Sequence, residues 1–513
     1  MTSTKRKAEA VQASASSTKR RKCPYLDTVN HQLLDFDFEK VCSISLSDQN
    51  VYACLVCGKY FQGRGRNTHA FTHSVQSSHH VFINLQTDHI YCLPENYEVV
   101  DNTLKPVQDA LRPTFEASQI AQLDQNRILA QDAFGVSYLP GFIGLNNLRH
   151  TDYINVVVQA LAHVPPLRDF FLVNKMNKVK SKLVLRFGEL LRKMWSPHNF
   201  KNTISPHELV QEISVISKKR FHVGRQSESV ELLAWMLNEL HKDLGGTQKP
   251  QSSIILKCFQ GLVEVTTDDE TKAASSELAE RGSAVTKKVS PFLMMALDLP
   301  STPLFKDSQG GNIIPQIPLF TVLEKYNGHQ VTYVLQDSHR LKKTYRINSL
   351  PPYLIFHVKR FTRNNFFIEK NPTIVNFPVK NLELRDYLKL DQSLPPEEDL
   401  REKSILELRA LLQEHNQSAK DCVEKADLIA KILQVAQPCT KYNLVANVCH
   451  DSPVATGQKA AQTNPLTEGS YRVHVQNRAT DQWYEIQDLH VQETMPQLIG
   501  VSESYLMVYE RKQ

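Results

Sequence analysis

Two cysteines and two histidines in the N-terminal part of the chain have the types and spacing of metal ligands. Cys54 and Cys57 are separated by two residues, His73 follows after fifteen more, and His79 after a further five. Two thiolates and two imidazoles can form a closed tetrahedral set around Zn²⁺. In a chain without a secretory signal, such a cysteine pair favours a metal over a disulfide. The spacing therefore predicts a structural zinc site.

Two alternatives stay open at this stage. His69 and His80 are rival ligands, and any one histidine alone is equally well explained as a core or surface residue. The spacing also fits a nucleic-acid-binding finger with two cysteines and two histidines. Residues 58–72, between the two ligand pairs, are rich in glycine, which argues against a recognition helix there.

Composition limits the function classes. The chain has 513 residues, enough for two or three domains, and 41% of them are hydrophobic against 22% charged. It has no long apolar run and no apolar signal-peptide core, so neither a membrane span nor secretion is expected. Much of the net charge of +6 lies near the N-terminus, so basicity alone does not indicate a nucleic-acid surface.

The first 22 residues are basic, without apolar periodicity, and are expected to be disordered. They contain the cluster Lys5-Arg6-Lys7, an eleven-residue spacer, and the cluster Lys19-Arg20-Arg21-Lys22. Two basic clusters at this separation resemble a bipartite nuclear import signal, which predicts a nuclear protein. The alternative is a solvated basic tail.

Residues 23–100 resemble the UBP-type zinc finger, a ubiquitin-binding module. The shared motifs are Cys23-Pro24-Tyr25-Leu26, Cys54 to Cys57, Gly63-Arg64, His69-Ala70, His73, His79 and Tyr91-Cys92. Multi-zinc members have further ligands where this chain has Tyr25, an isolated Cys42 and Gln62. The resemblance therefore implies one zinc ion, bound by Cys54, Cys57, His73 and His79. Cys23, Cys42 and Cys92 are then expected to be buried thiols.

Arg64 is the candidate contact for ubiquitin in this finger. The resemblance implies that the matching arginine grips the C-terminal glycines of free ubiquitin. A tyrosine that accompanies it in the family is replaced here by Leu93. Two hypotheses for the finger therefore remain: it binds ubiquitin, or it binds a different protein.

A second motif begins the large domain. Residues 144–161 read GLNNLRHTDYINVVVQAL, and the apolar positions after Asp152 have helical spacing. Asp152 stands where this helix should begin, so it is expected to cap the first turn. The segment resembles the opening box of the ubiquitin-specific proteases, GLxNxGNTCYxNxxxQxL. In that register Arg149 replaces a glycine, His150 replaces the asparagine that steadies the oxyanion, and Asp152 replaces the nucleophilic cysteine.

Two C-terminal motifs complete the comparison with this family. The catalytic histidine is normally found in GHY, and the matching tripeptide here has Ser470 in its place. The third catalytic position is taken by Gln487, with Asp488 adjacent. Cysteine catalysis needs a thiolate, a base and a group that orients the base. Asp152, Ser470 and Gln487 supply none of these, so the resemblance implies a protease domain without activity.

Cys449 and His450 are the remaining candidate dyad near these motifs. Consecutive residues of a strand point to opposite faces of the sheet, so the two side chains are not expected to act together.

The resemblance also implies the fold: an α+β, papain-like ubiquitin-specific-protease domain with thumb, palm and fingers, preceded by the small zinc finger. The expected organisation is a tail over 1–22, the finger over 23–100, a partly helical linker over 101–137, and the protease-like domain over 138–513. A helical insertion is expected near 391–440, as a docking element or as a hairpin capping its own domain. The region of the fingers has no CxxC pair between Gly261 and Leu293, so no zinc is expected there.

The combination of basic tail, one-zinc finger and degenerate protease domain resembles the noncatalytic, ubiquitin-specific-protease-like splicing factors. That resemblance implies a scaffold that supports assembly of the tri-snRNP and its recruitment to the spliceosome. The expected partners are tri-snRNP and spliceosomal proteins in the nucleus, and direct contact with RNA is left open. The alternatives are a ubiquitin-binding reader and a residual ubiquitin hydrolase.

Overall fold

The computed structural model describes residues 22–173, 180–269, 285–301, 314–336, 339–363, 368–389, 397–414, 422, 424–436, 439–452 and 464–512. The proposed import signal lies outside the described residues, apart from Lys22, and so does part of the segment 391–440. The chain forms two compact units, Met1–Arg112 and Pro113–Gln513.

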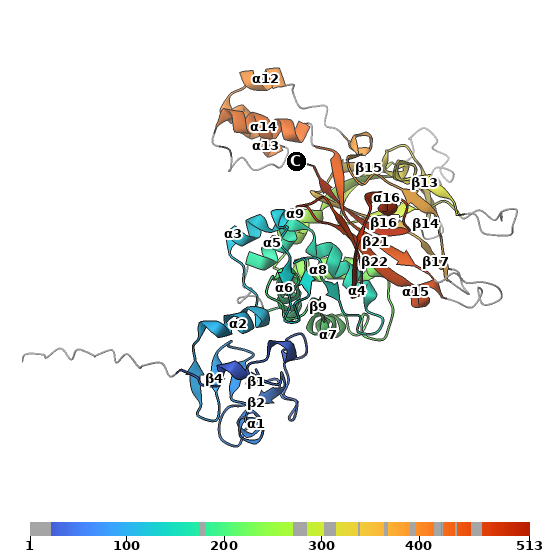
Figure 1. Cartoon of the computed structure of the whole chain (residues 1–513). Coiled ribbons are helices and arrows are strands. Elements are labelled where there is room, and N and C mark those ends of the chain that lie inside the picture. The colour runs from blue at the N-terminus through green and yellow to red at the C-terminus, as the bar shows by residue number, and fades with distance from the viewer. Residues whose placement is uncertain are drawn as a thin grey trace, which may run out of the picture. The chain divides into compact units, whose positions relative to one another are not determined.

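The first unit is built on a five-stranded antiparallel sheet with strand order β2-β1-β3-β4-β5 (Figure 1). Its elements are η1 (Leu26–Thr28), η2 (His31–Leu33), β1 (Val51–Cys54), β2 (Tyr60–Gln62), α1 (His69–Ser77), β3 (Val81–Asn84), β4 (Ile90–Cys92), β5 (Tyr97–Val99), η3 (Asn102–Leu104) and α2 (Lys105–Leu111), where η marks a 3-10 helix. Every residue of β1 and β3 is buried, so these two strands form the centre of the unit.

The first unit extends beyond residue 100, where its end was expected from the sequence. Val107 and Leu111 of α2 are buried, and the guanidinium of Arg112 donates to the carbonyl oxygens of Leu85 and Gln86 at 2.9 and 2.8 Å. Helix α2, predicted as part of the linker, therefore belongs to this unit.

Helix α4 is the central element of the second unit's helical part. The helices of this part are α3 (Ala117–Gln122), η4 (Leu123–Gln125), α4 (Asp152–Ala162), α5 (Pro165–Val173), α6 (Lys182–Trp195), α7 (His207–Ile216), α8 (Ser229–Asp243) and α9 (Ile254–Phe259). All residues of α4 are buried, and the helix packs against α8 and β22 (Figure 1). Two short strand pairs accompany these helices: β6 (Ala130–Gln131) with β7 (Ser137–Tyr138), and β8 (Gly144–Leu145) with β9 (Thr203–Ile204).

The main sheet of the second unit has strand order β12-β16-β25-β21-β22-β23-β24, and β20 pairs with β21. These strands are β12 (Met295–Asp298), β16 (Tyr353–Lys359), β20 (Leu382–Glu383), β21 (Lys441–Asp451), β22 (Ser470–Gln476), β23 (Trp483–Gln487), β24 (His490–Thr494) and β25 (Ser504–Arg511). Alternate residues of a strand face opposite sides. Val508 accordingly packs in the core shared with α4, while Met507 and Tyr509 pack in a second core. The sheet is thus buried on both faces.

A second, four-stranded sheet, β11-β10-β15-β14, corresponds to the predicted fingers. Its strands are β10 (Gly261–Asp269), β11 (Thr286–Phe292), β14 (Thr332–Gln336) and β15 (His339–Ser349). The remaining elements of the body are β13 (Gln316–Pro318), α11 (Leu319–Leu323), η5 (Glu324–Tyr326), β17 (Phe361–Arg363), β18 (Ile368–Lys370), β19 (Ile374–Asn376), η6 (Arg385–Tyr387), α15 (Pro465–Glu468) and α16 (Pro496–Ile499).

Among its described residues, the predicted insertion contains three helices, one more than a helical hairpin has. Its helices are α12 (Glu397–Glu402), α13 (Ile405–Glu414) and α14 (Lys425–Ala436). Leu400, Leu408, Leu428 and Ile432 form a small core of their own, which joins all three helices. The extra helix α12 contributes Leu400, which is fully buried.

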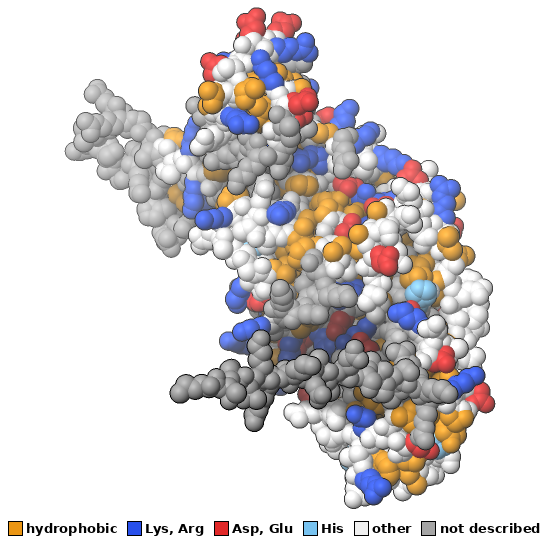
Figure 2. Space-filling model, turned by 90° about the vertical axis from the view of Figure 1, so that its left-hand side faces the viewer, with side chains coloured by type: hydrophobic (Ala, Val, Ile, Leu, Met, Phe, Trp, Pro, Cys, Tyr) orange, Lys and Arg blue, Asp and Glu red, His pale blue; other side chains and the backbone are white. Residues whose placement is uncertain are grey.

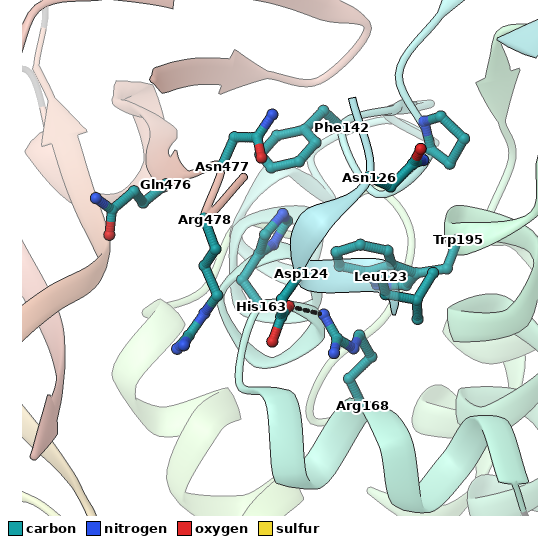
Figure 3. A pocket seen from close by; sticks show the side chains of 11 residues that line it. Leu123, Asp124, Asn126, Phe142, His163, Arg168, Trp195, Gln476, Asn477 and Arg478 are labelled. Atoms are coloured by element: carbon teal, nitrogen blue, oxygen red, sulfur yellow. Dashed lines mark hydrogen bonds and ion pairs between the residues drawn. The ribbon is translucent and has the colours of Figure 1, made fainter. Parts of the chain in front are cut away.

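The segment after residue 112 is attached to the second unit. Figure 3 shows Asp124 of η4 facing Arg168 of α5, and the two form an ion pair at 2.7 Å. Ile120 is buried in the core around α4, and the guanidinium of Arg127 donates to the carbonyl oxygen of Ala479 at 3.1 Å. These contacts make residues 113–137 part of the large unit. The helical part of this segment, α3 followed by η4, ends at Gln125.

No single helix among the described residues is long and apolar enough to cross a membrane. Helices α4 and α5 together are long and apolar enough, but they meet at a bend of 89°.

Candidate functional site

The four predicted metal ligands meet at one point of the first unit. The distances are 3.5 Å from Sγ of Cys54 to Nδ1 of His79, 3.4 Å from Sγ of Cys57 to Nε2 of His73, and 3.1 Å between the two ring nitrogens. Tetrahedral zinc with ordinary bond lengths needs about 3.6 Å between sulfur and nitrogen and about 3.3 Å between nitrogens. The donor set therefore fits Zn²⁺ in both chemistry and size.

The surroundings of this cluster orient the ligands. The ring of Phe61 stacks on His73 at 4.2 Å, and the hydroxyl of Ser77 lies 3.3 Å from Nδ1 of that histidine. These contacts turn Nε2 toward the other ligand atoms, as outer-shell partners of metal ligands do. The hydrogen bond between the two thiols lowers the pKa of Cys57 and raises the pKa of Cys54, so Cys57 is the first of the two to become the thiolate that binds metal.

The rival histidines lie outside the cluster. Nδ1 of His80 lies 2.7 Å from the carbonyl oxygen of Leu93, and its ring stacks on Tyr25 at 4.0 Å. His69 is the first residue of α1. Within the described residues, the cluster of potential ligands consists of Cys54, Cys57, His73 and His79, with all ligand atoms within 4.8 Å of one another.

Hydrogen bonds occupy the positions at which multi-zinc fingers have further ligands. Sγ of Cys42 accepts the backbone N–H groups of Ile44 and Ser45 at 3.5 and 3.4 Å. The hydroxyl of Ser45 donates to Gln62 at 2.9 Å, and the Gln62 amide donates to Ser47 at 3.1 Å. Local hydrogen bonding thus fixes this loop. The other thiols expected to be structural, those of Cys23 and Cys92, are buried.

Arg64 is held in a fixed orientation within the first unit. Its guanidinium lies over the ring of Tyr91 at 4.1 Å and donates to the Asn96 side chain at 2.6 Å. Leu93, which replaces the family's tyrosine, is fully buried and presents no polar group beside it.

Asp152, which the sequence predicts at the position of the nucleophile, is the first residue of α4 and is 4% exposed. Its Oδ2 accepts the backbone N–H of Tyr471 at 2.8 Å and the side-chain amide of Gln226 at 3.1 Å. The prediction that it caps the helix is wrong: Thr151 is the N-cap residue, and the carboxylate instead joins α4 to β22. Burial raises the pKa of Asp152, while the Tyr471 N–H opposes that rise.

Ser470 and Gln487 lie side by side on adjacent strands. Ser470 begins β22, Gln487 ends β23, and the amide of Gln487 donates to the Ser470 hydroxyl at 3.4 Å. The bond from Tyr471 to Asp152 places Ser470 next to α4. The structure therefore brings Asp152, Ser470 and Gln487, the three residues predicted to replace a catalytic triad, into one place.

Asp488 is the one carboxylate next to the third catalytic position, and it is bound within the opening box. Its two oxygens accept the side-chain amides of Asn155 and Asn147, each at 2.9 Å. Its carbonyl oxygen also accepts the backbone N–H of Leu145 at 2.9 Å. These bonds assign Asp488 a structural role, fixing the box against β23.

His150 is exposed, beside the mouth of a cavity of about 410 Å³ that Arg225, Gln226 and Glu228 also line. Its φ of 57° and the φ of 76° at Arg149 lie in the left-handed region. Among the described residues, Asp152, Ser470 and Gln487 have neither a thiol nor an imidazole within hydrogen-bonding distance.

Cys449 and His450 face opposite sides of β21, as the strand periodicity predicts. The ring of His450 packs against Tyr471 at 4.7 Å and Phe361 at 5.0 Å. On the other side, Sγ of Cys449 lies 3.8 Å from Nδ1 of His474. Burial raises the pKa of the Cys449 thiol, but the hydrogen bond to His474, the charge of His474 and the hydrogen bond to Ser502 act against it, and the pKa is lowered overall.

Sequence reasoning missed this contact of Cys449 with His474. Nε2 of His474 lies 3.0 Å from Glu485, which completes a cysteine, histidine and carboxylate row across β21, β22 and β23. Only the strand register reveals it, because Cys449 pairs with Arg472 and His474 is the diagonal neighbour. Cys449 is 0% and His474 2% exposed, so the row does not meet a macromolecular substrate.

Comparison with known proteins gives the family. The family profile described as "Ubiquitin carboxyl-terminal hydrolase" matches residues 143–509, and "Zn-finger in ubiquitin-hydrolases and other protein" matches residues 42–104. The first match spans more than half of the chain. The chain belongs to the ubiquitin carboxyl-terminal hydrolase family and carries a UBP-type zinc finger in front of the hydrolase-like domain. The predicted family and fold class are confirmed.

Relatives of similar length bear names from pre-mRNA splicing and from ubiquitin hydrolysis. The chain is 43% identical to "Ubiquitin carboxyl-terminal hydrolase 39" of Homo sapiens over 506 residues, covering 96% of this chain and 80% of that protein. It is 38% identical to "Probable mRNA-splicing protein ubp10" of Schizosaccharomyces pombe, covering 95% and 88%. A solved structure described as "Crystal structure of an essential yeast splicing factor" has 26% identity and a TM-score of 0.70, covering 95% and 100%.

Proposed function

We propose that this chain is a noncatalytic pre-mRNA splicing factor, a pseudo-deubiquitinase that supports tri-snRNP assembly and recruitment to the spliceosome. The observation that carries the proposal is the carboxylate of Asp152 at the position of the nucleophile, bonded to the backbone of Tyr471. The splicing names of the relative from Schizosaccharomyces pombe and of the solved yeast structure support the same conclusion.

The substituted positions, Asp152, Ser470, Gln487 and His150, have no catalytic role in this proposal. A carboxylate is a poor nucleophile toward an amide, and a serine hydroxyl is no base near neutral pH. Gln487 hydrogen-bonds Ser470 but has no charge with which to stabilise an imidazolium. Three substitutions in a group that acts as a unit are expected to remove activity together.

The finger supplies structure. One Zn²⁺ per chain is bound by Cys54, Cys57, His73 and His79, whose ligand atoms lie within 4.8 Å of one another. A closed set of four protein ligands leaves no open position for chemistry, and such a zinc stabilises the fold of a small unit.

The proposed setting is the nucleus, reached through the basic tail of residues 1–22. Tagged full-length protein from nuclear extract is expected to recover tri-snRNP proteins together with their small nuclear RNAs. Deleting residues 1–22 should reduce nuclear import and leave recovery from extract intact. Recovery of ubiquitin conjugates alone, with no spliceosomal component, would show that the splicing assignment is wrong.

A ubiquitin reader is the second candidate, favoured by the ordered guanidinium of Arg64. Titration with free ubiquitin tests it, with Arg64→Ala as the matched variant. Saturable binding to wild type that Arg64→Ala abolishes would support the reader, and no binding to either would exclude it. Cleavage of a ubiquitin C-terminal reporter tests residual hydrolysis in the same preparations, and none is expected.

A further inference from the structure

Two neighbouring loops of the large unit carry a concentration of exposed positive charge. The charges are those of Arg149, Lys218, Lys219, Arg220 and Arg225, all exposed. The loops are joined, because the backbone N–H of Gly224 donates to the carbonyl oxygen of Arg149 at 2.8 Å. We call these five residues the basic loop pair.

Phe221 anchors the longer loop in the core. Its side chain is 0% exposed, and its ring lies 6.3 Å from Tyr153 and 5.7 Å from Trp235. Backbone hydrogen bonds fix the cationic residues: Lys219 N–H donates to Ser214 at 2.7 Å, and Arg220 N–H donates to Ser217 at 3.1 Å. A surface held in one conformation loses less entropy on binding than a mobile one.

Little negative charge balances this surface. Arg220 pairs with Glu231 at 2.9 Å, and both side chains are about half exposed. None of the other four cations forms an ion pair with a carboxylate of the described part of the chain. The face drawn in Figure 2 shows the usual surface pattern, on which Lys and Arg side chains are interspersed with Asp and Glu. An uncompensated cationic surface attracts polyanions.

Three of these cations lie on left-handed backbone. Arg149, Lys218 and Lys219 have φ values of 76°, 53° and 62°, in the left-handed region. Glycine adopts this conformation without a penalty, whereas side chains with a Cβ are disfavoured there. Three cations thus stand where folding alone favours glycine. Glycine can therefore replace each of these three cations without disturbing the backbone, which allows their charges to be removed selectively.

We infer that the basic loop pair binds the phosphate backbone of RNA. This inference rests on the proposed splicing function for the choice of RNA over another polyanion. Lysine and arginine side chains neutralise phosphates regardless of sequence, so the surface positions RNA and does not read its bases. The cations lie on both loops, which suits a chain with repeated charges better than a single anionic group.

The test uses labelled oligouridylate and full-length protein, with the affinity measured by fluorescence anisotropy at several salt concentrations. The variant is Arg149→Gly with Lys218→Gly and Lys219→Gly, which removes three charges where glycine is conformationally favoured, so the fold should persist. Each phosphate contact contributes about 0.7 to the slope of log affinity against log salt for single strands. The slope should fall by about 2, and affinity near 0.1 M salt by about 100-fold.

A matched control removes the same charge elsewhere. Lys242→Gln, Lys249→Gln and Lys257→Gln change exposed lysines at and beyond the C-terminal end of α8, while the basic loop pair adjoins its start. The control should keep the wild-type slope, with the basic tail present in both variants. Equal losses in the two variants, or an unchanged slope in the glycine variant, would overturn the inference. So would competition by oligoglutamate as strong as that by oligouridylate of equal charge.

Failure of this inference is distinguishable from failure of the proposed function. The glycine variant should still recover spliceosomal proteins from nuclear extract, because the inference assigns RNA and not protein to the basic loop pair. Cross-linking of 4-thiouridine RNA to wild type should label peptides containing residues 217–226. Labelling confined to other peptides overturns the RNA surface alone, whereas recovery of no spliceosomal component by wild type overturns the splicing function.

Discussion

Replacing Asp152 by alanine measures how much this carboxylate stabilises the contact between α4 and β22. Its main partner is the backbone N–H of Tyr471, a residue that is 0% exposed. Alanine leaves this buried donor without an acceptor, which costs about 1–3 kcal/mol. Gln226 loses less, because its amide also donates to the carbonyl oxygen of Gly469 at 3.2 Å. The expected loss in the free energy of unfolding is therefore about 1–3 kcal/mol.

Asp152→Asn is the matched variant, since it keeps an oxygen acceptor and removes the charge. Burial raises the pKa of Asp152, so the folded protein disfavours the ionised form that the unfolded chain adopts above about pH 4. The resulting loss of folding free energy is absent at low pH. It develops as the pH rises from the pKa of Asp152 in the unfolded chain to its higher pKa in the folded protein. Asparagine should thus stay within about 1 kcal/mol of wild type and gain on it as pH rises above about 4.

Urea unfolding followed by tryptophan fluorescence is the assay. Trp195, Trp235 and Trp483 are the three tryptophans of the chain, and all belong to the large unit, so the signal reports this unit alone. If alanine costs nothing, or alanine and asparagine cost the same, the carboxylate does not bridge α4 and β22. If wild type cleaves an isopeptide bond and Asp152→Ala does not, the noncatalytic assignment fails.

Three further predictions concern the metal and the buried histidines. Elemental analysis should find one zinc per chain, and Cys57→Ser should lose it and unfold the finger; zinc retained in that variant would refute the ligand set. Burial lowers the pKa of His163 to about 4 and of His450 to about 3. The free energy of unfolding should therefore fall as the pH drops below 6.5, by about 2 kcal/mol for each histidine at pH 5. His450→Phe should flatten the pH dependence of the urea midpoint. Burial by itself lowers the pKa of His474, but hydrogen bonds with Cys449 and Glu485 raise it to about 9. Protonated His474 should therefore stabilise the fold fully below pH 6.5, and this stabilisation should be lost between pH 6.5 and 9. A urea midpoint that stays unchanged across that pH range would contradict this.

Local patterns in the sequence predicted the elements whose partners are near in the chain. The spacing of Cys54, Cys57, His73 and His79 singled out the four side chains that meet in the finger. The apolar periodicity after Asp152 predicted the helix that the structure shows as α4, beginning at that residue. In both cases, the residues that decide the structure lie within a few turns or one hairpin of each other.

Contacts between distant segments were beyond such patterns. Asp152 was placed correctly at the start of a helix, but its partner Tyr471 is 319 residues away, and a local cap was the only role that sequence could suggest. The row of Cys449, His474 and Glu485 depends on the register of three strands. The end of the finger was misplaced because α2 packs back on strands that precede it.

Most residues of the opening box serve the fold, and this explains how the motif can be present without the chemistry. Asn155 donates to the carbonyl oxygen of Leu145 at 3.2 Å, and Gln159 donates to that of Ile143 at 2.7 Å. Both bonds hold α4 against the segment that precedes it. At Gly144 a Cβ would lie 2.7 Å from the backbone of Leu489, so any larger residue would separate the box from β23. These three requirements hold whether the first residue of α4 is a cysteine or an aspartate. A match to the box therefore identifies the fold and does not by itself establish activity.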